Sequence, residues 1–463
     1  FVPRGQVPDE VLRGIVGDAF AGFGHGDVVC SRAIGGATVL ELFHGPTLAF
    51  KDLGMQVLCK ILGYFLEQSD ERLNLLVGTS GDTGSSAIEA VKDIPRVTIT
   101  VLYPGCNRIA RLQELQMTTS DGANGVKVIA VDGTSDDLDV PMETLFGDVR
   151  FARTHKIGSV NSVNICRVLV QVAHFVWAAV TSSDGCDSLR FFVPTGAGGH
   201  VTAGAMARAM LAEDDTRIEL HVATNENDSF HRILSTGAVS SDKVVTQSVA
   251  PSMDIAIPYN LERLMWLAAM EGRDGRDDHG QVERCLAAAK LMRSFKQTGG
   301  IVLPTALRQR LVRVCGITGS SRHSNASTLA TIRAVNDEDG YVLDPHTATG
   351  VAAMRNMSRS EGTLNVCMAC AHPAKFSKAI ADALGSRNGG GGRDDPWWWL
   401  SAADRSHPSL ARLLNLDREG GEPATELYAR GTDWVARLRG WFEAQTEEQR
   451  RKDRALSKRS SRL

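Results

Sequence analysis

The fold class follows from one stretch of the chain, Leu73-Asn-Leu-Leu-Val-Gly-Thr-Ser-Gly-Asp-Thr-Gly-Ser-Ser86. Its apolar first residues predict a buried strand, and the pattern after the loop predicts a helix that begins near Ser85. The glycines let backbone N–H groups approach an anion, and the hydroxyls add donors at the positive helix end. The loop therefore predicts an anion site, and a plain strand–helix turn with a Ser or Thr cap stays open as the simpler alternative.

The same strand-then-helix pattern continues on both sides of this stretch. Short apolar runs predict further buried strands at residues 97–102, 126–131, 189–193 and 218–222. Amphipathic stretches predict helices at residues 53–67, 85–92, 109–118, 136–146, 165–180 and 201–211. The polar segment 272–324 is expected to be helical and to lie on the substrate-domain side. This alternation predicts an α/β fold with mostly parallel sheets, whose ligands bind beyond the carboxyl ends of strands.

A lysine stands at the start of one predicted helix, in Glu41-Leu-Phe-His-Gly-Pro-Thr-Leu-Ala-Phe-Lys-Asp52. The positive end of a helix disfavours the ammonium form of Lys51. That favours the neutral amine needed for Schiff-base chemistry. The alternative is a surface lysine, because most of the 51 Lys and Arg residues of such a chain are solvated charges.

Three further polar loops lead into predicted helices. Val193-Pro-Thr-Gly-Ala-Gly-Gly-His200 is a second glycine-rich loop of the phosphate-cradling type. Asn161-Ser-Val-Asn-Ile-Cys-Arg167 places amides, a hydroxyl and a guanidinium at a helix start, and Arg suits a bidentate grip on phosphate or carboxylate. In Leu343-Asp-Pro-His-Thr-Ala-Thr-Gly350, His346 is more typical of a cap than of a catalyst.

Composition narrows the class of partner. The 463 residues are enough for two or three domains, and the net charge of −3 gives no reason to expect nucleic acid or a membrane surface as partner. Nine dispersed cysteines suit a reducing compartment, and no signal peptide or membrane-spanning run is evident, so we expect a cytoplasmic protein. Cys367-Met-Ala-Cys370 is a single pair, so no metal site is expected.

Taken together, the motifs resemble the threonine synthase family of pyridoxal-phosphate enzymes, in that family's order, over most of residues 1–384. They are the run from His44 to Asp52, the loop 79–84, Gln116-Met-Thr-Thr119, Asn161-Ser-Val-Asn164, Asn225-Glu-Asn-Asp228, Met253-Asp-Ile255, Asp344-Pro-His-Thr347 and Ala371-His-Pro-Ala-Lys-Phe376. The loop after Pro194 and the run Ile257-Pro-Tyr-Asn-Leu-Glu-Arg263 look closer to the threonine synthase-like 2 branch. That branch is a catabolic phospholyase, whereas true threonine synthases usually carry Asn in the glycine loop.

The resemblance implies two open-sheet α/β domains of the tryptophan synthase β-subunit-like architecture, known as fold type II. The expected divisions are 1–50 as a remnant of an N-terminal region with the start of the large domain, 51–165 as the smaller domain, 166–384 as the large cofactor domain, and 385–463 as a Gly-rich linker and basic tail. The family also carries a further N-terminal stretch ahead of the part that matches Phe1. The chain is expected to be a monomer or a homodimer.

The resemblance also implies roles for individual residues. Lys51 would bind pyridoxal 5'-phosphate as a Schiff base and act as the general base. The cofactor would further contact Asp82, Gly196, Ala197, Gly198, Gly199 and Cys370, whose thiol stands where the family usually has Ser or Thr beside the pyridine nitrogen. A small phosphorylated amino-acid substrate would contact Ser80, Gly81, Thr83, Arg108, Asn161, Ser162, Asn164 and Arg167. His200 replaces a usual Asp or Asn.

Three functions follow as alternatives. The first is a phospholyase that converts O-phosphohomoserine or O-phosphothreonine to 2-oxobutanoate, ammonia and phosphate. The second is threonine synthase, which converts O-phosphohomoserine and water to threonine and phosphate. The third is a non-catalytic relative that binds the cofactor or a ligand. A nucleotide-binding enzyme is disfavoured, because no Gly-x-Gly-x-x-Gly with an acidic ribose partner and no Gly-Lys-Ser/Thr motif occurs.

Overall fold

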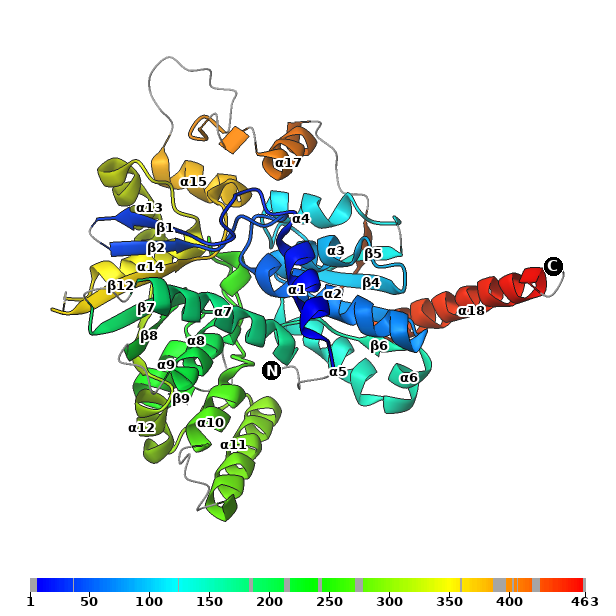
Figure 1. Cartoon of the computed structure of the whole chain (residues 1–463), viewed down its shortest axis with the longest axis horizontal. Helices are drawn as coiled ribbons and strands as arrows, with labels where there is room; N and C mark the ends of the chain where they lie inside the picture. The colour runs from blue at the N-terminus through cyan, green and yellow to red at the C-terminus, as the bar shows by residue number, and fades with distance from the viewer. Residues whose placement is uncertain are drawn as a thin grey trace.

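Two sheets organise the molecule into two lobes (Figure 1). The computed structural model describes residues 6–35, 37–123, 125–182, 186–211, 217–239, 244–270, 278–358, 360–385, 397–401, 404–405, 407–418 and 425–460. Every pairing in the two sheets is parallel except that of the first two strands, which form an antiparallel hairpin. The predicted α/β class with two open sheets is therefore confirmed.

The larger sheet has the order β1-β2-β12-β7-β8-β11. Its strands are β1 (Cys30–Ile34), β2 (Ala37–Glu41), β12 (Thr363–Ala369), β7 (Ser188–Pro194), β8 (Arg217–Thr224) and β11 (Ile317–Arg322). A hydrophobic core lies on each face of this sheet, and successive side chains of a strand point to opposite faces. Phe191 therefore packs with one set of helices and Phe192 with the other. The first set is α7 (Ile165–Thr181), α8 (Gly199–Met210), α10 (Leu261–Ala269) and α11 (Asp278–Thr298), and the second is α13 (Asn325–Asp339), α14 (Pro345–Arg355) and α15 (Ser377–Leu384).

The smaller sheet has the order β13-β5-β4-β3-β6. Its strands are β13 (Glu426–Tyr428), β5 (Val126–Val131), β4 (Val97–Pro104), β3 (Leu73–Gly78) and β6 (Ile157–Gly158). One face packs on α2 (Lys51–Ser69), α3 (Asp82–Val91) and α4 (Arg111–Thr118). The other face packs on α5 (Asp139–Gly147), α6 (Val149–Thr154) and α18 (Trp434–Ser460). The loops that follow β3 and β7 end at one common cavity, so the two lobes meet where ligands are expected.

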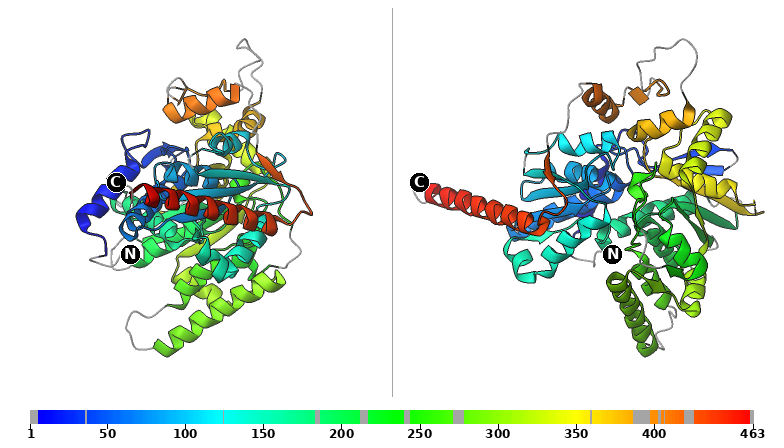
Figure 2. Two further views of the ribbon diagram at one scale, coloured as in Figure 1. Left: turned by 90° about the vertical axis from the view of Figure 1, so that its right-hand side faces the viewer. Right: turned by 180° about the vertical axis from the view of Figure 1, so that it is seen from behind.

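The remaining elements are short connections and outer helices. They are α1 (Asp9–Phe20), η1 (Asp136–Leu138), α9 (Ser229–Thr236), β9 (Ala238–Val239), η2 (Pro251–Met253), β10 (Ile301–Val302), α12 (Thr305–Arg313), η3 (Pro373–Phe376) and α17 (Pro408–Arg418). The last helix, α18, packs at its start and then extends away from the body (Figure 2). No helix in the described part of the chain is both long enough and apolar enough to cross a bilayer.

Two segments differ from the sequence-based expectation. Segment 272–324, whose residues 272–277 lie outside the described ranges, contributes β11 to the larger sheet and packs α11 into the core of that lobe. The pattern missed β11 because Ile-Thr-Gly-Ser-Ser-Arg is mostly polar. Residues 386–396, most of the expected linker, lie outside the described ranges, but the chain beyond them is not only a tail. Trp397 is buried beside α4, and β13 adds a strand to the smaller sheet.

Candidate active site

Lys51 is the first residue of α2 and is fixed by the turn before it. The carboxylate of Asp52 accepts hydrogen bonds from the N–H of Thr47 at 2.8 Å and from its hydroxyl at 2.6 Å. Gly45 is required in this turn, because a β-carbon there would lie 2.5 Å from Asp52. The turn therefore fixes the position of Lys51 at the cavity where the two lobes meet.

The Lys51 side chain is held at the edge of a buried carboxylate. Its Nζ lies 3.5 Å from Oδ2 of Asp82, the first residue of α3. Burial lowers the pKa of Lys51 below its ordinary value; Asp82 opposes this, whereas Arg167 and Lys375 add to it. The surroundings thus shift Lys51 toward the unprotonated amine, chiefly through burial, whereas the sequence-based prediction rested on the helix start.

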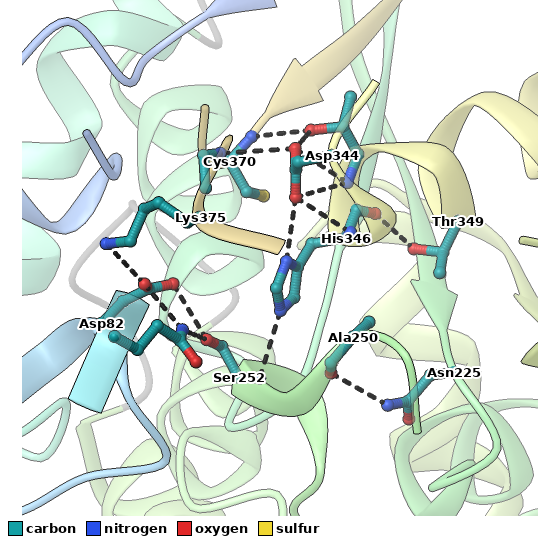
Figure 3. A network of polar contacts seen from close by, with 12 residues as sticks. Asp82, Asn225, Ala250, Ser252, Asp344, His346, Thr349, Cys370 and Lys375 are labelled. Carbon is teal, nitrogen blue, oxygen red and sulfur yellow. Dashed lines mark hydrogen bonds and ion pairs between the residues drawn. The ribbon is translucent and has the colours of Figure 1, made fainter. Parts of the chain in front are cut away.

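A second lysine binds the same carboxylate. Nζ of Lys375 lies 2.8 Å from Oδ1 of Asp82 and also donates to the carbonyl oxygen of Thr47 at 2.8 Å (Figure 3). Gln113 donates to Oδ1 at 2.8 Å and the hydroxyl of Ser252 donates to Oδ2 at 2.9 Å. Burial would raise the pKa of Asp82, but Lys375 and then Lys51 outweigh burial and hold it well below its ordinary value. Asp82 is therefore a buried anion that is paired with Lys375 and lies within reach of Lys51.

A polar relay continues from Ser252 into the larger lobe. Its backbone N–H donates to Nε2 of His346 at 3.1 Å, and Nδ1 of His346 lies 2.9 Å from Oδ1 of Asp344 (Figure 3). Asp344 caps α14 by accepting from the N–H groups of His346 and Thr347. The cap of α14 is thus Asp344 rather than His346, whose ring bonds to that cap and links α14 to the lysine site through Ser252.

The glycine-rich loop after β7 forms a cradle at the start of α8. Gly198 has φ of +82°, and a β-carbon there would lie 2.4 Å from the Phe230 ring. Asn260 holds the loop by donating its backbone N–H at 2.9 Å and its side-chain amide at 3.0 Å to the carbonyl of Ala197. Close backbone approach at a helix N-terminus suits a phosphate group. Among the described residues, Nδ1 of His200 and Nε of Arg167 are buried without a hydrogen-bond partner, and both residues line the same cavity.

Two adjoining cavities surround these groups. The inner cavity is lined by Phe50, Lys51, Ser80, Asp82, Thr83, Ser162, Arg167, Gln171, the segment 194–200, Ser252, Met253, Ile255, His346 and Cys370. The outer cavity, of about 440 Å³, shares Ser80, Thr83, Ser162, Ala197 and Ile255 with it and adds Asn161 and three acidic side chains, Asp136, Asp139 and Glu143. The inner cavity is thus a candidate cofactor site, and the outer cavity is a candidate substrate site that opens onto it.

Most residues named from the sequence meet at these cavities. Lys51, Asp82, Gly196, Ala197, Gly198, Gly199 and Cys370 line the inner cavity, together with Ser80, Thr83, Ser162 and Arg167. Asn161 lines the outer cavity, donates to the carbonyl of Gly78 at 2.9 Å, and has an Oδ1 with no partner among the described residues. The thiol of Cys370 is buried, which raises its pKa well above the ordinary value and keeps it neutral.

Four residues named from the sequence are placed differently from expectation. The N–H of Gly81 donates to the Thr79 hydroxyl at 2.9 Å, so it is engaged within the loop. Asn164 caps α7 and donates to the carbonyl of Ser159. Arg108 lines a small third cavity that shares Ser80 with the other two. Arg167 lines the inner cavity and donates to the carbonyl of Val160, so it stands with the cradle and not in the outer cavity.

Sequence reasoning did not single out Lys375, Ser252 and Gln113, which complete the surroundings of Asp82. A usable signal existed for Lys375, because it stands in the apolar run Ala371-His-Pro-Ala-Lys-Phe376 and a lysine in such a run is seldom solvated. Ser252 and Gln113 come from distant segments, and only the fold brings them to the carboxylate.

Comparison with known proteins agrees with this site. A family profile described as pyridoxal-phosphate dependent enzyme matches residues 37–312, and one described as threonine synthase, C-terminal, matches residues 347–418. The first profile matches more than half of the chain, and the cofactor is pyridoxal phosphate. The second profile covers part of the region after residue 384 that the sequence-based resemblance had left unmatched.

Relatives that match most of the chain identify the family of enzymes to which it belongs. Threonine synthase-like 2 of Rattus norvegicus is 36% identical over 453 residues, covering 96% of this chain and 84% of that protein. Threonine synthase of Pseudomonas aeruginosa is 36% identical over 380 residues, covering 82% and 76%. The chain belongs to the threonine synthase family.

Solved structures of the family have the same fold. Yeast threonine synthase matches with a TM-score of 0.79 at 28% identity, covering 98% of this chain and 87% of that one. The pyridoxal-phosphate-bound threonine synthase of Brucella melitensis matches with a TM-score of 0.76 at 32% identity, covering 96% and 86%.

Proposed function

We propose that this chain is a phospholyase that acts on O-phosphohomoserine or O-phosphothreonine and releases phosphate, ammonia and 2-oxobutanoate. The observation that carries the proposal is Ala197, a residue without a polar side chain that lines both the inner and the outer cavity. Relatives named threonine synthase-like 2 are 36 to 38% identical to this chain and the threonine synthase of Pseudomonas aeruginosa is 36% identical, so the choice between the two outcomes rests on the loop.

The cradle and the inner cavity would hold the cofactor. The backbone of residues 196–199 at the start of α8 would bind its phosphate, and the unpartnered Nε of Arg167 would add a positive charge there. The thiol of Cys370 would stand beside the pyridine ring as a weak, neutral donor. When bound, pyridoxal phosphate spreads the negative charge that forms when the substrate loses its Cα proton.

Lys51 would move that proton. Burial lowers the pKa of its amine, yet Asp82 lies 3.5 Å away and would stabilise the ammonium once a proton arrives. Lys375 keeps Asp82 ionised for this purpose, so the carboxylate does not itself take the proton.

The outer cavity would hold the amino acid. The hydroxyls of Ser80, Thr83 and Ser162 line both cavities and would bind the carboxylate or the amine side of the substrate. The acidic residues of the outer cavity would repel a phosphate group placed among them. Arg108 lies in the adjoining small cavity with Ser80 and Ser135, and it offers the substrate phosphate a cation.

The two main outcomes differ in where one water molecule is used. The synthase outcome adds water at Cβ of the substrate. The phospholyase outcome instead uses water to hydrolyse the imine that remains after phosphate has left, which gives 2-oxobutanoate and ammonia. Water must be held over Cβ for the first outcome, and a methyl group at position 197 cannot accept or donate a hydrogen bond to hold it. The hydroxyl-lined outer cavity keeps the synthase outcome as the alternative.

Product analysis tests the proposal. The purified holoenzyme is incubated with O-phosphohomoserine and, separately, with O-phosphothreonine, and 2-oxobutanoate, ammonia, threonine and phosphate are quantified together. We expect 2-oxobutanoate and ammonia in amounts equal to phosphate. Threonine as the major product would support the synthase, and a protein that binds the cofactor but releases no phosphate would support a non-catalytic relative.

A further inference from the structure

A second cluster of chemically capable side chains lies at the base of the β1–β2 hairpin, outside both cavities of the active site. Cys30 and Glu41 are directly opposite each other in the antiparallel pair, so their side chains share a face. His44 follows Glu41 by three residues. The N–H of Gly24 donates to the carbonyl of His44 at 2.8 Å, which brings His25 to the same place.

The ligand atoms of this cluster form two groups of three that share Cys30, and each group is compact enough for a small metal ion. Nε2 of His44 lies 3.0 Å from Oε2 of Glu41, and Sγ of Cys30 lies 3.9 Å from Nε2 of His25. The ligand atoms of Cys30, Glu41 and His44 all lie within 4.8 Å of one another. Tetrahedral zinc with ordinary bond lengths separates its ligand atoms by about 3.3–3.7 Å. Cys30, Glu41 and His44 thus need only small side-chain movements to close on an ion, and His25 would join them beside Cys30, the residue that both groups share.

Neighbouring groups already orient the ligands. The Tyr341 hydroxyl donates to Oε1 of Glu41 at 2.9 Å, and Nε of Arg32 lies 3.6 Å from the same oxygen, so Oε2 points toward His44. Nδ1 of His25 lies 3.0 Å from the backbone nitrogen and 3.1 Å from the carbonyl oxygen of Asp27, so Asp27 fixes the ring; a proton on Nδ1, with the carbonyl as acceptor, would leave Nε2 as the ligand atom. Such outer partners are typical of protein metal sites.

We propose that Cys30, His25, His44 and Glu41 form a zinc-binding site. The thiolate and the two imidazoles favour zinc over calcium or magnesium, which prefer oxygen ligands. Burial, with Glu41 and Asp27, raises the pKa of Cys30 to about 11, and a bound dication would offset the repulsion between thiolate and carboxylates. The ion would join the segment before β1 to the turn that leads from His44 to Lys51, so its role would be structural.

Metal content tests the site. The holoenzyme is dialysed against zinc, freed of excess metal and analysed by plasma mass spectrometry. Cobalt is then added to metal-free holoenzyme, and its absorption is read in the red, away from the cofactor band. We expect about one zinc ion per chain and the intense absorption of tetrahedral cobalt with a thiolate ligand. Wild-type protein that retains no stoichiometric zinc would overturn the proposal.

Variants locate the ion. Cys30→Ser and His25→Ala should lower the zinc affinity by at least about 100-fold, and Tyr341→Phe, which removes an outer partner, by about tenfold. Cys285→Ser is the control, because it removes a half-buried thiol from α11, which lies well away from the hairpin (Figure 1), and it should bind zinc as wild type does. Zinc binding that survives Cys30→Ser, in protein whose circular dichroism and cofactor content are unchanged, would contradict the assignment.

Discussion

The ammonium of Lys375 lies 2.8 Å from Oδ1 of Asp82, and neither residue is more than 3% exposed. A buried ion pair of this kind gives little net stability, but removing one partner leaves a costly unpaired charge. The pair is therefore better understood as a device that fixes the charge of Asp82, and with it the protonation of Lys51.

Replacing Lys375 should impair both catalysis and folding. Lys375→Met should destabilise the protein by about 3 kcal/mol, because Asp82 loses its nearest cation. It should also lower kcat by about 10- to 100-fold. Because the charge of Lys375 lowers the pKa of Lys51, its removal should raise that pKa and move the acid limb of the kcat–pH profile to higher pH. Urea unfolding and pH-dependent kinetics measure the two effects.

The exposed Lys378, three residues further along, provides the control, and Lys378→Met should be silent in both assays. The double variant Lys375→Met/Asp82→Asn should lose less stability than the sum of the single variants, because the charge left unpaired has been removed. Additive losses would show that Lys375 does not act through Asp82.

Position 197 should control the fate of the product. Ala197→Asn places an amide between the two cavities, where it can hold a water molecule for addition at Cβ. The ratio of threonine to 2-oxobutanoate from O-phosphohomoserine should rise by about fivefold, the equivalent of one hydrogen bond of about 1 kcal/mol. Ala197→Leu matches the added volume without the amide and should not raise the ratio, so equal effects of both variants would contradict this explanation.

The cradle should tolerate no side chain at Gly198. Gly198→Ala combines a left-handed φ of +82° with a contact of 2.4 Å to the Phe230 ring. We expect a loss of at least about 1–2 kcal/mol of stability and a weaker affinity for pyridoxal phosphate, measured by cofactor titration. Gly440→Ala on α18, where a β-carbon meets nothing within 4 Å, should be neutral or should stabilise the protein by up to about 1 kcal/mol.

His200 should make the enzyme sensitive to acid. Burial lowers the pKa of His200 to about 3, against an ordinary value of 6.5, so the unfolded chain binds more protons between these values and stability falls as the pH drops below 6.5. From pH 7 to pH 5, wild type should lose about 2 kcal/mol more than His200→Asn. Urea midpoints at the two pH values measure the difference. Equal losses would show that His200 is not held neutral.

The strand–helix alternation predicted the fold well because buried parallel strands and amphipathic helices have distinct apolar periods. The strands predicted at 73–77 and 97–102 are present and extend one and two residues further, and the strand predicted at 126–131 has those bounds. The polar strand β11 was missed, since its place depends on pairing with β8 rather than on its own residues.

The site could be predicted only in part, and for a physical reason. The loops that hold Lys51 and Gly198 carry local signals, namely glycines and a helix start. The pairing of Lys375 with Asp82 joins residues 293 positions apart (375 − 82) and has no local signature. The proposed zinc site likewise has no local sequence signature, because Cys30 and Glu41 are brought together only by the register of β1 and β2.

Chemical trapping of the cofactor tests the central claim most directly, because Lys51 and Lys375 flank the same carboxylate. The holoenzyme is treated with sodium borohydride, which makes the bond between pyridoxal phosphate and its lysine permanent, and the labelled peptide is identified by mass spectrometry. The account predicts about one label per chain, on Lys51, and none in Lys51→Ala. A label on Lys375, or no label in protein that retains its fold, would contradict it.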